Sequence, residues 1–131
     1  MIVNDPETKK EVERAFARYE RALVTNDVEA LDAFFWNDPL AIRYGGGENL
    51  YGYEAIAAFR AARSPAGLMR SLEKTVVTTF GTDFATASTL FRRSNAPGAI
   101  GRQMQTWVRT PAGWKIVAAH VSTIPEQEEG S

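Results

Sequence analysis

The sequence predicts an α+β fold in which about three helices pack into a strongly curved antiparallel sheet. Helix-forming patterns are confined to the first 62 residues, and long strand-forming segments follow from about residue 70. Helices that precede a run of strands favour an α+β fold over an alternating α/β fold. We expect the sheet to wrap around the first helix as a cone-shaped α+β roll with one open mouth.

The first helix is expected to begin at residues 4–7, which offer an Asx cap, a proline and an acid. Such residues stabilise the free backbone groups of a first turn. Apolar residues then recur at helical spacing, at Val12, Phe16, Tyr19 and Leu23. This pattern is typical of an amphipathic helix. Residues 25–27 end the helix and cap a second one, from 28 to about 35.

The middle of the chain predicts a small hairpin, a third helix and two strands. Strands at about 41–44 and 48–51 flank Gly45-Gly46-Gly47, and a helix follows at about 53–62. Residues 64–67 break that helix, since serine, proline and glycine favour turns. Strands are then expected at about 70–80 and 84–93, with a loop at 94–100.

The closing segment, residues 101–122, predicts a hairpin of two long strands around a turn at 110–113. Pairing Arg109 with Lys115 divides the side chains between two faces. One face carries Arg102, Met104, Thr106, Val108, Ile116, Ala118, His120 and Ser122. The other carries Gln103, Gln105, Trp107, Arg109, Lys115, Val117, Ala119 and Val121. We expect the first face to be a pocket floor whose polar end is formed by Arg102, His120 and Ser122.

Composition indicates one globular domain, residues 1–124, followed by a short acidic tail, 125–131, that we expect to be disordered. The 131 residues are 44% apolar and 24% charged, with a net charge of −1 and no cysteine. Nothing in this balance favours nucleic acid or an anionic membrane as a partner. The chain lacks an apolar run of the ~18 residues that span a bilayer, and residues 1–10 do not resemble a signal peptide. We therefore expect a cytoplasmic protein.

Two side chains are candidates for proton transfer, and each has an alternative interpretation. His120 is the single histidine, and its reference pKa suits a proton carrier at neutral pH; it also suits a hydrogen-bonded residue of a pocket wall. Tyr19 lies on the apolar stripe of the first helix. It is either a core tyrosine with its hydroxyl at the edge, or a phenol that projects into the pocket.

Arginines suggest a small anionic ligand. Arg43 precedes the glycine run and is either a solvated edge-strand residue or a guanidinium that binds a carboxylate at the pocket mouth. Arg60, Arg63 and Arg70 flank the third helix and the loop after it. Together with Arg43 and Arg102 they outnumber the nearby acids, which favours binding of an anion.

The sequence gives no indication of a metal or cofactor. The glycine run lacks the lysine and the serine or threonine of a phosphate-binding loop. A single histidine, the absence of cysteine and the spacing of the acids do not form a metal-ligand pattern, and no Ser/His/Asp triad is indicated. We expect a site that works without metal or cofactor.

The sequence resembles a specific group of proteins over residues 12–122. The segments are GENLYG at 47–52, FRAAR at 59–63, GRQMQTWVR at 101–109 and GWKIVAAHVS at 113–122, with Tyr19 and Arg43-Tyr44-Gly45. They resemble the oxalurate-catabolism and 1,3-dicarboxyurea hydrolase group of the nuclear-transport-factor-2-like superfamily, whose fold is a SnoaL-like, cystatin-like cone.

The resemblance implies a homodimer packed through its sheets, with Gln103, Gln105 and Trp107 as interface candidates, and a functional link to an amidase. It also implies a decarboxylating amidohydrolase that converts 1,3-dicarboxyurea to allophanate. The functional tyrosine and arginine of the group correspond to Tyr19 and Arg43. Met104 is larger than the residue expected at its position, which predicts an effect on substrate size.

The candidate residues and the family resemblance lead to one hypothesis for the reaction. Arg43, with Arg63, Arg70 or Arg102, holds a carboxylate of a planar dianion, and Tyr19 transfers a proton or positions water. Met104, His120 and Ser122 line the pocket in this hypothesis. The alternative is a non-catalytic protein that binds a small ligand or serves an amidase as an accessory subunit. An isomerase or dehydratase is less favoured, because no carboxylate base was expected on the pocket face.

Overall fold

The computed structural model describes residues 1–126, which form three helices and six strands. Two helices come first, a pair of short strands precedes the third helix, and four long strands follow it. The helices are α1 (Pro6–Val24), α2 (Val28–Phe34) and α3 (Tyr53–Ala62). The strands are β1 (Ile42–Tyr44), β2 (Asn49–Tyr51), β3 (Ser71–Phe80), β4 (Phe84–Arg92), β5 (Ala99–Thr110) and β6 (Gly113–Pro125). Each predicted helix and strand is present, with ends displaced by at most a few residues.

The first two helices begin at aspartate caps, because a carboxylate accepts hydrogen bonds from free amides of the first turn. The Asp5 carboxylate accepts from the backbone N–H of Thr8 at 3.1 Å and from its hydroxyl at 2.8 Å, and Pro6 opens the helix. The Asp27 carboxylate accepts from the N–H of Ala30 at 3.1 Å. Only residues 25–27 therefore separate the end of α1 from the beginning of α2.

The six strands form one mixed sheet in the order β2-β1-β6-β5-β4-β3. β1 lies parallel to β6, whereas the other neighbouring pairs are antiparallel. The expectation of an entirely antiparallel sheet is therefore wrong at one pair. The chain passes through α1 and α2 before β1, so that β1 approaches the edge of β6 in the same direction as β6.

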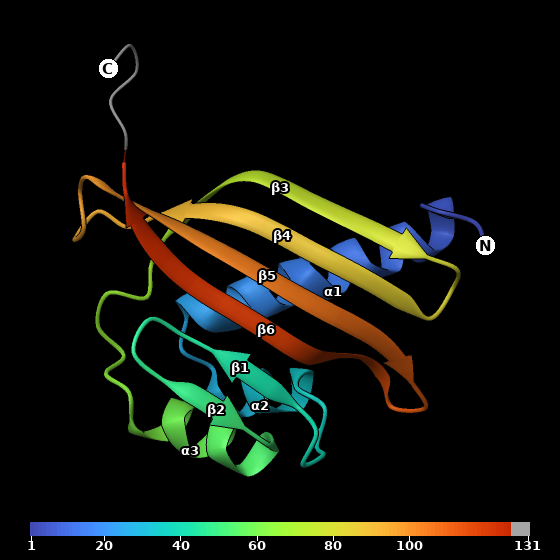
Figure 1. The fold of residues 1–131 in the computed structure, drawn as a ribbon, viewed down its shortest axis with the longest axis horizontal. Coiled ribbons are helices and arrows are strands. Elements are labelled where there is room, and N and C mark those ends of the chain that lie inside the picture. Colours follow the sequence, from blue (N-terminus) through green and yellow to red (C-terminus); the bar gives the residue numbers. More distant parts are fainter. Residues whose placement is uncertain (127–131) are drawn as a thin grey trace.

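α1 crosses one face of the four long strands, and α2 and α3 lie beside the short β1–β2 pair (Figure 1). The core forms between α1 and this inner face of the sheet. Its α1 members are Val12, Ala15, Phe16, Tyr19, Ala22 and Leu23, and its strand members include Val77, Ala85, Ala87, Trp107, Ile116 and Ala119. These elements form the cone-shaped, cystatin-like α+β fold that the order of elements predicts.

The assignment of faces in the closing hairpin is wrong, although its pairing is partly right. Arg102 pairs with Ser122 and Met104 with His120, as expected. A bulge then leaves Val117 without a partner, so that Trp107 pairs with Ile116. The bulge turns Ile116 to the inner side, where it is fully buried. The rest of the face expected to form the pocket floor, from Arg102 to Thr106 and from Ala118 to Ser122, points outward, and Met104 is 59% exposed on it.

The opposite face, expected to be a dimer surface, is the inside of the cone. Gln103 and Gln105 are each 2% exposed, and Trp107 is fully buried under α1. They are therefore not available to a partner. The error has a physical cause. The inner face carries the polar residues Gln103 and Gln105, and the outer face carries the apolar residues Met104 and Val108. Polarity alone therefore indicates the wrong face as the buried one.

Two smaller expectations change at the ends of the strands. β5 begins at Ala99, inside the predicted loop, and β6 continues to Pro125, which pairs with Ala99. The Glu126 carboxylate accepts a hydrogen bond from Arg92 at 2.6 Å. The first residues of the predicted tail thus belong to the sheet edge, and the remainder, 127–131, lies outside the described residues.

Gly101 should be essential for the packing of the inner face. A Cβ at this position would lie 2.1 Å from the ring of Phe91, which is itself 2% exposed. We predict that Gly101→Ala lowers the free energy of unfolding by about 1–3 kcal/mol, the usual cost of overpacking. Chemical denaturation measures this. Gly46→Ala is the matched control, since nothing lies within 4 Å of its added Cβ; equal stability of the two variants would contradict the account.

Candidate functional site

Arg43 points into the cone, which decides between the two interpretations of this residue. It pairs with Ala119 of β6, and Ala119 pairs with Gln105 of β5. Lateral neighbours in a sheet share a face, and both neighbours are buried. The small side chain of Ala119 leaves room for the guanidinium, which stacks on the ring of Phe59 with its central carbon 5.2 Å from the ring centroid.

Tyr19 lies on the same inner side. Its ring packs edge-to-face on Trp107, Phe34 and Phe35 with centroids 6.5, 6.1 and 6.5 Å away, and the residue is 6% exposed. Trp107 donates its indole N–H to the side-chain oxygen of Gln105 at 3.1 Å. Tyr19 therefore packs on Trp107, which is hydrogen-bonded to Gln105, and Gln105 pairs with Ala119, the neighbour of Arg43.

Three arginines around this region are neutralised by acids. Arg43 donates to Glu48 at 2.8 Å, and Arg60 pairs with Asp32. Arg70 donates to both carboxylate oxygens of Glu20, at 2.9 and 2.6 Å, and to the side-chain oxygen of Gln103 at 3.0 Å. Each pair compensates a charge that would be costly to bury alone. Arg70, expected to bind substrate, instead ties α1 to β5.

Arg63 differs from these three, because two of its side-chain nitrogens are buried without a hydrogen-bond partner among residues 1–126. They are Nε and Nη2. Burial lowers the pKa of Arg63, the positive charges of Arg60, Arg43 and Arg93 lower it further, and Tyr19 opposes them. Arg63 therefore lies within electrostatic reach of both Tyr19 and Arg43, at the end of α3.

Together these residues form a partly buried cationic cluster, within electrostatic reach of the Tyr19 phenol. A guanidinium with free donors binds carboxylates through paired hydrogen bonds. Burial strengthens this attraction, since the effective dielectric constant is lower inside a protein than in water. The arrangement suits a small planar anion, held by Arg63 and Arg43, with Tyr19 positioned to exchange a proton.

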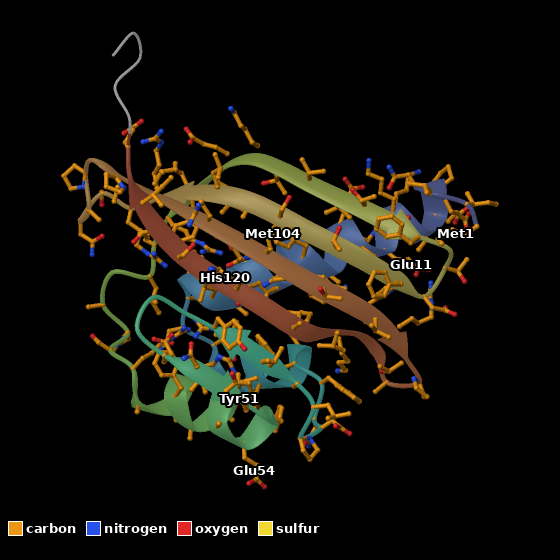
Figure 2. All side chains as sticks on the ribbon, viewed as in Figure 1. Met1, Glu11, Tyr51, Glu54, Met104 and His120 are labelled. Carbon is orange, nitrogen blue, oxygen red and sulfur yellow. The ribbon has the colours of Figure 1, made fainter. Side chains whose placement is uncertain are left out.

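Four of the predicted site residues lie elsewhere. Arg102, Met104, His120 and Ser122 are on the outer face of the sheet, where the Arg102 guanidinium donates to the Ser122 hydroxyl at 3.0 Å. His120 packs edge-to-face on Tyr44, with ring centroids 6.5 Å apart. Figure 2 shows Met104 and His120 on neighbouring strands of this sheet. The structure thus separates them from Tyr19, Arg43 and Arg63, which it brings together.

Gln103, Gln105 and Arg93 belong to the inner side and were not expected there as site residues. Arg93 follows Phe91 on the inward parity of β4, and its guanidinium lies 4.7 Å from the centroid of the Phe91 ring. The alternation of small residues at Ala85 and Ala87 with Phe91 was the pattern that could have identified this inward face.

The main hollows on the surface of the described part of the chain are lined by residues other than Tyr19, Arg43, Arg63 and Arg93. A groove of about 520 Å³ lies between α1, α2 and the turn of the β5–β6 hairpin, and Glu11, Arg14 and Trp114 are among its lining residues. Figure 2 shows Glu11 toward the opposite end of the sheet from His120. Within residues 1–126, no three His, Asp or Glu side chains are gathered as metal ligands.

None of the helices in the described part of the chain combines the length and apolar character needed to cross a bilayer.

Solved structures similar to this chain have the same fold. A Pectobacterium atrosepticum protein of unknown function is 57% identical, with a TM-score of 0.91 over 93% of this chain and 94% of that chain. A cystatin-like fold protein of Burkholderia xenovorans is 54% identical, with a TM-score of 0.93 over 97% and 99%. A proposed dehydratase of the NTF2-like family from Streptomyces avermitilis is 20% identical, with a TM-score of 0.76 over 94% and 99%, and shows the fold alone.

No curated protein matches the sequence significantly. The sequence model of the AtzH-like family matches residues 1–127, which is nearly the whole chain. This match over nearly the whole chain supports one assignment. The chain belongs to the AtzH-like family.

Proposed function

We propose that this protein is a decarboxylating amidohydrolase that cleaves a C–N bond in a small anionic ureido or carbamoyl acid such as 1,3-dicarboxyurea. The observation that carries the proposal is Arg63, whose buried Nε and Nη2 have no partner within the described residues. Burying guanidinium nitrogens without a partner is costly even in a half-buried side chain, and an anionic ligand removes that cost. Tyr19 and Arg43 lie within electrostatic reach of Arg63.

In this proposal the two arginines hold the substrate. Arg63 offers its free N–H groups to one carboxylate, and Arg43 approaches from β1 with Glu48 fixing its orientation at 2.8 Å. Orientation by two guanidinium groups lowers the barrier through proximity. Their positive charge also stabilises negative charge that develops during the reaction.

Tyr19 supplies the proton. As the phenol protonates a nitrogen of the carbamate group, the bond between this nitrogen and the carboxylate carbon breaks. Its electron pair stays on nitrogen, CO₂ leaves, and allophanate remains. Water then returns a proton to the phenolate, and the hydroxide left over combines with CO₂ as bicarbonate, so that one water is consumed overall. The charge of Arg63, within electrostatic reach of Tyr19, stabilises the phenolate meanwhile. This balance calls for neither metal nor redox cofactor.

A direct assay tests the proposal against the accessory alternative. Purified protein is mixed with 1,3-dicarboxyurea alone, and CO₂ and allophanate are measured against the uncatalysed rate. Turnover by the protein alone supports an enzyme. Binding without turnover, or turnover only when an amidase is added, supports a ligand-binding or accessory protein instead.

Tyr19→Phe should abolish most of the turnover without unfolding the protein. Phenylalanine keeps the edge-to-face contacts with Trp107 and Phe34 but cannot donate a proton. We predict a fall in kcat of about 100-fold or more, the usual size of a lost general acid. Tyr44→Phe is the matched control, because that tyrosine lies beside His120 on the outer face. A Tyr19→Phe enzyme with kcat within a few-fold of the unmodified protein would exclude the proton-transfer role.

Arg43→Met should raise KM by about tenfold or more, because a charged hydrogen-bonding partner of the substrate is lost. Methionine retains packing on Phe59, but Glu48 then remains as an uncompensated acid in the pocket. The double variant Arg43→Met with Glu48→Gln removes that acid. We expect KM to stay high in the double variant. Recovery of KM would show that Arg43 only neutralises Glu48.

We also propose that the protein forms a homodimer through the outer face of the sheet. The residues first expected at the interface are buried inside the cone, whereas the outer face exposes large apolar side chains. They are Val76, Phe84, Met104 and Ile124. A second copy of the same face is the natural occupant, because a two-fold axis brings a patch onto itself, and burying it removes apolar surface from water.

Met104→Glu should dissociate this dimer. A carboxylate at the centre of an apolar interface would face its own copy across a two-fold axis. Light scattering after size exclusion should show a monomer at micromolar concentration. Met69→Glu is the matched control, because Met69 is 68% exposed on the loop after α3. A Met104→Glu protein that remains a dimer would place the interface elsewhere.

A further inference from the structure

We propose that Arg93 and Gln103 form a second carboxylate subsite, which makes the pocket select dianions over monoanions. The inference rests on the proposed function for the class of substrate, and adds the residues that determine specificity. In this inference the selection of dianions comes from Arg93 and Gln103, and not from Tyr19 or Arg43.

Gln103 provides a donor whose direction is fixed. Its side-chain oxygen accepts a hydrogen bond from Arg70 Nη2 at 3.0 Å, so that the amide nitrogen points the other way. That nitrogen, Nε2, is buried and has no partner among residues 1–126. An amide N–H that is buried and unsatisfied is uncommon in folded proteins and calls for a ligand or water. Gln103 is 2% exposed, on the inner face of β5.

Arg93 provides the charge beside it. The guanidinium groups of Arg70 and Arg93 both lie over the Phe91 ring, 4.5 and 4.7 Å from its centroid. Arg70 is neutralised by Glu20, but the Nε of Arg93 is buried without a partner in the described part of the chain. Burial lowers the pKa of Arg93, as does the charge of Arg70, and Glu20 opposes them. Phe91 therefore holds Arg93 and Arg70 at the same ring, and Arg70 also contacts Gln103.

The balance of charge then indicates two negative charges on the ligand. Arg43, Arg60 and Arg70 are each paired with an acid, although Nε of Arg60 has no hydrogen-bond partner among the described residues. Arg63 and Arg93 differ in that each has buried nitrogens without a hydrogen-bond partner and, within residues 1–126, no acid pairs with either. Arg63 follows α3, and Arg93 follows β4, so that they reach the pocket from different walls. Arg93 lies close enough for its charge to lower the pKa of Arg63. Two carboxylates at the two ends of one small molecule match this arrangement better than a single anionic group.

Two inert probes test the inference by binding alone. Glutarate has the same chain length as 1,3-dicarboxyurea and carries two carboxylates, and glutaramate replaces one carboxylate by a neutral amide. By titration calorimetry, we expect the unmodified protein to bind glutarate about tenfold or more tightly than glutaramate, as expected for a charge-assisted pair. Arg93→Met should weaken glutarate binding by about the same factor and leave glutaramate binding unchanged.

The chain offers a matched control and a second variant. Arg92→Met removes the adjacent arginine, which pairs with Glu73 and Glu126 at the sheet edge, and should change neither affinity. Gln103→Glu retains an oxygen for Arg70 but places a negative charge next to Arg93. It should also remove the preference for glutarate, which tests the subsite even where Arg93→Met is poorly folded.

Retention of the glutarate preference in Gln103→Glu and in a folded Arg93→Met protein would overturn the inference, and so would an unmodified protein that binds neither probe. The reaction is judged separately. An Arg93-dependent preference without turnover of 1,3-dicarboxyurea would support the subsite and contradict the proposed reaction. Turnover of 1,3-dicarboxyurea without an Arg93-dependent preference for glutarate would support the proposed reaction and contradict the subsite.

Discussion

The central constraint in this protein is the partial burial of guanidinium groups that have no acidic partner within residues 1–126. A charge removed from water costs several kcal/mol unless a partner compensates it. Three arginines of the pocket wall have such partners in Glu48, Asp32 and Glu20, but the buried nitrogens of Arg63 and Arg93 have none within residues 1–126. The fold tolerates this cost, which is expected of a binding site and not of a core built for stability alone.

The surrounding structure serves to hold these groups in place. Consecutive residues of α1 have complementary tasks: Tyr19 packs on Trp107 and offers its phenol, and Glu20 neutralises Arg70. Phe91 supports two guanidinium groups on its ring and itself packs on Gly101, where a side chain would displace it. Because an anion would bind the folded state alone, its binding should also stabilise the fold.

Local patterns predicted the elements well but did not show which side of the sheet is inside. Caps at Asp5 and Asp27 and the apolar stripe of α1 depend on neighbours in sequence, and they were confirmed. The inward direction of Gln103 depends on where α1 crosses the sheet, and the glutamines gave the wrong indication because buried polar residues are rare outside functional sites. The bulge at Val117 and the parallel approach of β1 were likewise tertiary features.

The same limits explain which site residues could be predicted. The sequence pattern made Tyr19 and Arg43 candidates, and the resemblance favoured their functional roles. The structure brings both to the inner side, within electrostatic reach of Arg63. Met104 and His120 were predicted as site residues because the outer face was taken for the pocket floor, and they lie outside the cone.

A crystal structure of the protein with 3-oxoglutarate, the carbon isostere of 1,3-dicarboxyurea, tests the central claim most directly. The account predicts the ligand between Tyr19, Arg43 and Arg63; a ligand bound only in the groove beside Trp114, or none in the cone, would contradict it.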